Sequence, residues 1–228
     1  MNLSSIILQV SNDLITSPDA EEIKLSLWEL AKEGGWIMVV LAIFSIIAVY
    51  IFAERFVSIN KAAKKDDNFM NMIRNYMIEG KIDEAKDLCK QTDTSISRMI
   101  EKGLSRIGKP LNDIQTAIEN VGNLEVSKLE KGVALIGMIS GAAPMLGFLG
   151  TVTGMIRAFY DMSMAGNNID IELLSAGIYE AMVTTVGGLF VGILAYIFYN
   201  IIVSKIDKVV NLLESKSIEF MDVLNEPA

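Results

Sequence analysis

The sequence predicts an all-α membrane protein with three transmembrane helices, two of them extended far into the cytoplasm, and a helical cytoplasmic domain. Of its 228 residues 51% are hydrophobic, and the mean hydropathy is +0.40, which is more apolar than an ordinary soluble domain of this length. Three long segments carry almost no charge, and the polar segments around them place apolar residues at helical spacing.

Each of the three apolar segments is long enough to cross a hydrocarbon core of about 30 Å as a helix. The first predicted span covers residues 36–53 and has no charged residue. The second covers 132–157 and is uncharged as far as its last residue, Arg157. The third covers 173–204, where Glu180 is the one charged residue.

Basic residues near the ends of the spans predict the orientation, because such residues stay on the cytoplasmic side. They follow the first span, precede the second and follow the third: Arg55, Lys61, Lys64, Lys65, Lys128, Lys131, Lys205 and Lys208. The short loop 158–172 contains neither lysine nor arginine. We therefore expect residues 54–131 and 205–228 to be cytoplasmic, and residues 1–35, with an interfacial amphipathic helix, to lie outside with that loop.

The cytoplasmic segments are patterned as helices. Residues 54–131 predict a helical hairpin that turns at Gly80, then a break at Gly108 and Pro110. A helix is expected to begin near Asn112 and to continue without interruption into the second span. The third span is expected to continue as a helix through residues 205–228. Both long helices keep an apolar stripe beyond the bilayer, which predicts bundling with further copies of the chain.

Composition argues against several classes of protein. A net charge of −8 and the absence of a basic face argue against nucleic-acid binding. One cysteine, Cys89, excludes an internal disulfide, and the lack of histidine removes the commonest metal ligand. No nucleophile–base pair, metal cluster or phosphate loop is visible, so we expect neither an enzyme nor a bound metal or cofactor. Proton chemistry would then depend on carboxylates or water.

The second span carries a face of small and mildly polar residues, spaced alternately by four and three positions. It consists of Ser140, Pro144, Gly147, Thr151, Gly154 and Ala158. One interpretation is close helix packing, supported by the small-xxx-small pair of Gly150 and Gly154. The other is a pore lining, in which Thr151 offers a hydroxyl to water or to a partner carboxylate. Pro144 is expected to bend this helix.

The third span has a comparable face. Glu180 and Thr184 are four residues apart, and Gly177 and Gly188 continue the same side. Thr185 lies about a quarter of a turn away, so spacing alone favours Thr184 over Thr185 as the pore residue. Glu180 is either a solvated glutamate at the membrane surface or a group facing a wet cavity, where it could exchange protons.

The chain resembles the ExbB/TolQ/MotA family of proton-channel proteins, and its ExbB members most closely. The resemblance is most specific over residues 143–156, APMLGFLGTVTGMI, and 177–189, GIYEAMVTTVGGL. It is supported by Gly34-Gly35-Trp36 before the first span and Glu54-Arg55 after it. The resemblance implies a homopentamer around an ExbD-like single-span partner, whose intramembrane aspartate carries protons. It also places channel threonines at Thr151 and Thr185, whereas spacing favours Thr184.

The function implied by this resemblance is an ExbB-like subunit of a proton channel in the bacterial inner membrane, with the N-terminus periplasmic and the C-terminus cytoplasmic. Such a channel uses the proton motive force, through a TonB-like protein, to energise outer-membrane transport. The alternatives are a TolQ-like subunit for outer-membrane integrity and constriction, and a membrane scaffold that conducts nothing.

Overall fold

The computed structural model describes residues 35–63, 67–164 and 171–225. Within these ranges the chain forms helices and no strands. Nearly all of the predicted N-terminal segment 1–35, with its interfacial helix, lies outside the described residues, as does part of the loop 158–172.

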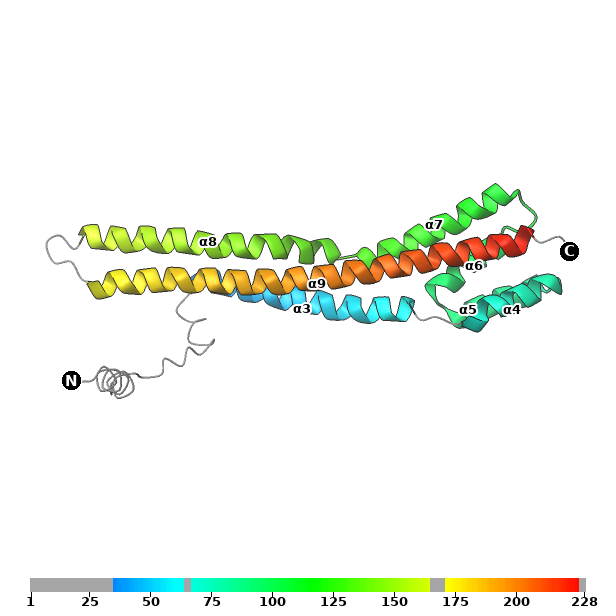
Figure 1. Cartoon of the computed structure of the whole chain (residues 1–228), viewed down its shortest axis with the longest axis horizontal. Helices are drawn as coiled ribbons and strands as arrows, with labels where there is room; N and C mark the ends of the chain where they lie inside the picture. The colour runs from blue at the N-terminus through cyan, green and yellow to red at the C-terminus, as the bar shows by residue number, and fades with distance from the viewer. Residues whose placement is uncertain (1–34, 64–66, 165–170, 226–228) are drawn as a thin grey trace, which may run out of the picture.

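Three of the helices are long and apolar enough to cross a membrane. They are α3 (Gly35–Ala62), α8 (Val133–Met164) and α9 (Ile171–Asn225). Figure 1 shows α8 and α9 running side by side along the molecule, with α3 beside α9. These helices confirm the predicted all-α fold with three candidate transmembrane helices. They also run further than the predicted spans, since α8 continues to Met164 and α9 has no break.

The prediction of one uninterrupted helix from Asn112 into the second span is wrong. α7 covers Leu111–Glu130, and α8 begins only at Val133. Between them Gly132 has φ +82°, a left-handed conformation that glycine adopts easily and that ends a right-handed helix. Arg55 of α3 supports this break, because its guanidinium donates a hydrogen bond of 2.8 Å to the carbonyl of Lys128 in the last turn of α7.

The remaining helices form what we call the polar end of the molecule, together with the C-terminal half of α9 (Figure 1). They are α4 (Asp67–Ile78), α5 (Ile82–Thr92), α6 (Ser95–Leu104) and α7. α4 and α5 are joined by a turn at Gly80, which has φ +69°. A core of apolar side chains from α6, α7 and α9 holds the polar end together, and it includes Met99, Ile100, Ile118 and Phe220.

A buried carboxylate joins α6 to α7. Glu125 is 3% exposed and accepts hydrogen bonds from Arg98 (2.5 Å), Lys128 (2.7 Å) and Ser95 (3.0 Å). Burial alone raises the pKa of Glu125, but the three hydrogen bonds and the charge of Arg98 outweigh burial and lower that pKa from 4.5 to about 2. Glu125 therefore stays ionised under ordinary conditions, and it links two helices through its partners. We call this cluster the Glu125 junction.

Candidate functional site at the α8–α9 contact

The backbones of α8 and α9 touch along a line of small residues, which we call the seam. It is formed by Gly147, Gly150 and Gly154 on α8 against Gly177, Ala181 and Gly188 on α9. A Cβ on Gly188 would lie 2.6 Å from the carbonyl oxygen of Ala143 and 2.8 Å from the Cα of Gly147. Such distances are too short for any side chain, so the glycines are what allow the two helices this approach.

Pro144 also lies at the seam, where it packs against Gly192 of α9, a residue that was not among the predicted site residues. A Cβ on Gly192 would meet the Pro144 ring at 2.5 Å and the Ser140 carbonyl oxygen at 3.2 Å. The Ser140 carbonyl is the one whose helical donor is replaced by the proline ring. The spacing of Gly188 and Gly192, four residues apart, was the signal in the sequence that could have identified this contact.

The two adjacent threonines of α9 converge on one carbonyl of α8. Thr185 donates a hydrogen bond of 3.0 Å to the carbonyl of Gly147. Thr184 lies 3.5 Å from the same carbonyl and donates a shorter bond, 2.7 Å, to Ala181 in its own helix. Thr184 is 2% exposed, and a Cβ on Gly150 would collide with its side chain. Thr184 therefore fills the seam, whereas Thr185 is only half-buried.

One flank of the seam is covered by α3. On α9, Gly187 lies against Met38, and Phe198 stacks on Phe52 with ring centroids 4.1 Å apart. Thr185 lies on the other flank. Each residue turns a helix by about 100°, so Thr185 and Gly187 point to opposite sides of Thr184, which itself points into the seam. We call the flank away from α3 the open flank.

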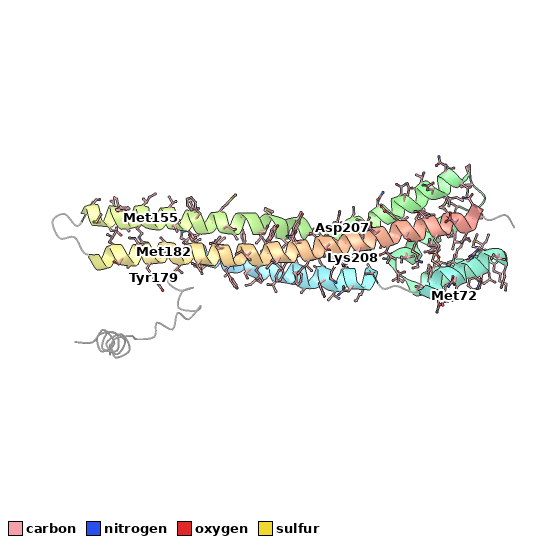
Figure 2. The ribbon with its side chains drawn as sticks, viewed as in Figure 1. Met72, Met155, Tyr179, Met182, Asp207 and Lys208 are labelled. Atoms are coloured by element: carbon pink, nitrogen blue, oxygen red, sulfur yellow. The ribbon has the colours of Figure 1, made fainter. Side chains whose placement is uncertain are left out.

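Thr151 of α8 borders the same open flank. Its hydroxyl donates to the Phe148 carbonyl of its own helix at 2.7 Å, and its side chain is half-buried. Its neighbour one turn on, Met155, is 41% exposed, and Met182 beside Thr185 is 62% exposed. Figure 2 shows Met155 and Met182 near the same end of the helix pair. Each helix of the pair thus presents one half-buried threonine beside the seam, on the flank away from α3.

Glu180 lies on the opposite flank, beside the beginning of α3. A Cβ on Gly35 would be 2.8 Å from the Glu180 Oε1 atom, and Gly35 has φ +60°. The first turn of a helix has unpaired N–H groups and a positive dipole end, both of which stabilise a carboxylate. Glu180 thus lies toward α3, on the side away from Thr185, while Glu180 and Thr184, four residues apart, keep the common face of α9 that their spacing predicts.

Residues 91–215 match the MotA/TolQ/ExbB proton channel family. This stretch is more than half of the chain and contains α6, α7, α8 and the whole seam. The chain belongs to this family. It is a membrane protein, and its three apolar helices agree with that assignment.

Individual relatives are similar at low identity. A biopolymer transport protein ExbB homolog of Methanothermobacter thermautotrophicus is 27% identical over 82% of this chain and 66% of its own length. The biopolymer transport protein ExbB of Neisseria meningitidis serogroup A is 24% identical over 72% of this chain and 79% of its own. The Tol-Pal system protein TolQ of Haemophilus influenzae is 32% identical over 44% of this chain and 42% of its own. The chain thus spans about two thirds of the first of these relatives.

Proposed function

We propose that this chain is an ExbB-like subunit of a proton channel in the bacterial inner membrane, with its N-terminus periplasmic and its C-terminus cytoplasmic. In this proposal five copies enclose an ExbD-like single-span partner, and proton flow through the assembly drives a TonB-like protein that energises outer-membrane transport. Each proton would release about 2.3 kcal/mol per 100 mV of membrane potential.

The proposal is supported by the position of Thr151 and Thr185, one on each helix of the seam and both beside the open flank. In a ring of copies with α3 outermost, this flank faces the interior. Neither a threonine nor the methionines beside it binds and releases protons near neutral pH. A proton carrier must therefore come from elsewhere, which supports a partner with an intramembrane carboxylate.

The hydrogen bonds of the two threonines suit this role. Each hydroxyl donates its proton to a backbone carbonyl, Thr151 to Phe148 and Thr185 to Gly147. A hydroxyl that donates in this way keeps its lone pairs free to accept. Those lone pairs could accept a hydrogen bond from water or from the protonated form of a partner carboxyl. Thr184 offers no such acceptor because it is buried in the seam, so the proposal assigns the pore position to Thr185.

The test is proton flux into vesicles that contain the chain together with its single-span partner, followed with a pH-sensitive dye. Thr151→Val keeps the shape of the side chain but removes the acceptor, and we expect it to lower the flux at least about tenfold. Glu180→Gln is expected to lower the flux as well, because the loss of the negative charge weakens the contact between α9 and the beginning of α3. Full flux in both variants, with normal assembly, contradicts the proposal.

Two other functions remain distinguishable by experiment. The match to the TolQ protein of Haemophilus influenzae supports a TolQ-like subunit, which predicts that deletion of this chain weakens the outer membrane while leaving iron-complex uptake intact. A non-conducting scaffold predicts an intact complex with the partner but no proton flux.

A further inference from the structure

A groove opens between α7 and α9 at the polar end of the molecule, with a volume of about 640 Å³. Figure 1 shows α7 diverging from α9 there. The residues that line it come mainly from these two helices, with one from α6, and they include Glu119, Gly122, Val126, Leu213, Ser217 and Met221. We call it the α7–α9 groove.

The groove continues the open flank of the seam. Val210 follows Thr185 by about seven complete turns of the same helix, so the two residues point to nearly the same side of α9. A smaller cavity of about 290 Å³, lined by Glu130, Tyr199 and Asp207 among others, lies between them. Figure 2 shows Asp207 near the place where α8 gives way to α7. Two cavities therefore follow one another along this side of α9, from Tyr199 to Asp222 at the polar end.

The chemistry of the α7–α9 groove is distinctive. Its floor is apolar, with Val126, Val210, Leu213 and Met221, and Ile218 on its edge is 63% exposed. Its charged residues are all acidic: Glu119, Glu214 and Asp222. None of these three forms an ion pair with a residue in the described ranges. A large apolar surface in a polar part of a molecule marks a site for a partner, and this one is rimmed with uncompensated negative charge.

The spacing of the lining residues indicates that the partner segment is a helix. α7 contributes Gln115, Glu119, Gly122 and Val126, and α9 contributes Val210, Leu213, Ser217 and Met221, at intervals of three and four in both helices. Two helices that present such rows side by side form the seat for a third helix. A helix that fits would carry an apolar stripe at the same spacing, with lysine or arginine on both sides of it.

We propose that the α7–α9 groove binds a basic amphipathic helix at the cytoplasmic end of the single-span partner. This inference rests on the proposed function, because a partner helix lying against Thr151 and Thr185 would leave the membrane on the side where the groove opens. A second copy that presented its own α7–α9 face would bring acidic residues together. The N-terminal segment of the chain is also acidic, with six carboxylates against Lys24 and Lys32.

The test uses the purified full-length chain in detergent micelles and a fluorescent helical peptide of leucine and lysine, about 18 residues long or five turns. Leucines form one stripe in this peptide, and lysines flank it. A scrambled peptide has the same composition without the stripe. Binding is followed by fluorescence anisotropy at two salt concentrations.

Two variants probe the groove, and one serves as a control. Glu119→Gln with Glu214→Gln removes rim charge without changing size, and Ser217→Trp fills the groove while keeping the charge. The matched control, Asp113→Asn with Glu84→Gln, removes the same charge from exposed residues that do not line the groove. We expect each groove variant to weaken binding of the striped peptide about tenfold and the control to change it less than about twofold.

Several results would overturn the inference: no binding, equal binding of the scrambled peptide, or equal weakening by the rim and control variants. A change of oligomeric state caused by Ser217→Trp would show that a second copy occupies the groove. Proton flux measured on the same preparations with the partner separates this inference from the proposed function. Normal flux without specific peptide binding would contradict the proposed role of the groove but not the proposed channel. Specific binding without flux in the wild-type complex would contradict the proposed channel function.

Discussion

The α8–α9 seam and the Glu125 junction both hold two helices together, but with opposite chemistry. The seam is built mainly of glycine and alanine, and the helices approach until Gly188 lies against the Gly147 backbone. The Glu125 junction buries a charge that three donors satisfy. Within lipid there is no hydrophobic force to bring helices together, so close packing must do it. At the polar end the hydrophobic effect drives the helices together. A carboxylate can be buried there as well, because three hydrogen-bond donors satisfy it.

The largest effect is expected at the seam, from Gly188→Val. The added side chain would collide with the backbone of α8 at Ala143 and Gly147, so the helices must separate along the whole contact. Overpacking of this kind typically costs about 1–3 kcal/mol, and we expect about 3 kcal/mol or more here because the collision is with backbone atoms that no side-chain movement can relieve. Thermal unfolding in detergent measures the loss.

The matched control for Gly188 is Gly141→Ala in the same pair of helices. No atom lies within 4 Å of the Cβ that this change adds, so we expect the Tm to stay the same or to rise slightly. Equal loss of stability in Gly188→Val and Gly141→Ala would show that the seam is not the critical contact.

A smaller and pH-dependent effect is expected at the Glu125 junction, from Glu125→Gln. Because folding lowers the pKa of Glu125 from 4.5 to about 2, its ionised form stabilises the fold above about pH 4.5, and this contribution is lost as the pH falls toward 2. We expect Glu125→Gln to cost about 1–3 kcal/mol at pH 7 and progressively less as the solution becomes acidic. Chemical unfolding of both proteins between pH 2 and 7, over the range where the fold persists, measures the difference.

The control for Glu125→Gln is Asp87→Asn, which removes an exposed ion pair of 3.3 Å with Lys90. Exposed pairs contribute little, so we expect a change below about 0.5 kcal/mol at every pH. A gap between wild type and Glu125→Gln that does not shrink on acidification would argue against the ionised junction.

The smallest effect on stability is expected where α3 meets Glu180, from Gly35→Ala. The new Cβ would crowd the Glu180 carboxylate at a positive φ, at a cost of about 1–2 kcal/mol. Glu180→Ala removes the crowded atoms, so the double variant should lose less than the sum of the single variants. A double-mutant cycle by thermal unfolding tests this coupling. Additive losses would mean that the two residues do not interact.

The sequence was sufficient to predict the three spans, because long uncharged segments have few alternatives to a membrane helix. The break at Gly132 was also signalled in the sequence, because Lys128 and Lys131 followed by a glycine are a typical helix C-terminus. The prediction of an uninterrupted helix followed the apolar stripe instead. What the sequence could not show is the hydrogen bond from Arg55 of α3 to the Lys128 carbonyl.

At the candidate site, too, local sequence patterns predicted some features, whereas others depend on contacts between helices. Periodicity identified the small-residue faces, but it favoured Thr184 as the pore residue, whereas the family resemblance implied Thr185. That choice depends on which flank of the seam α3 covers, and no local pattern contains it. The position of Glu180 beside Gly35 was missed for the same reason, since the two residues lie on helices far apart in the sequence.

In the proposed channel, the open flank and not the seam carries the proton path. The most direct test compares the proton flux of Thr185→Val with that of Thr184→Val, each reconstituted with the single-span partner. We expect Thr185→Val to lower the flux at least about tenfold and Thr184→Val, an isosteric change of a buried residue, to leave it within about twofold. Loss of flux in Thr184→Val together with normal flux in Thr185→Val would mean that the seam, and not the open flank, carries the protons.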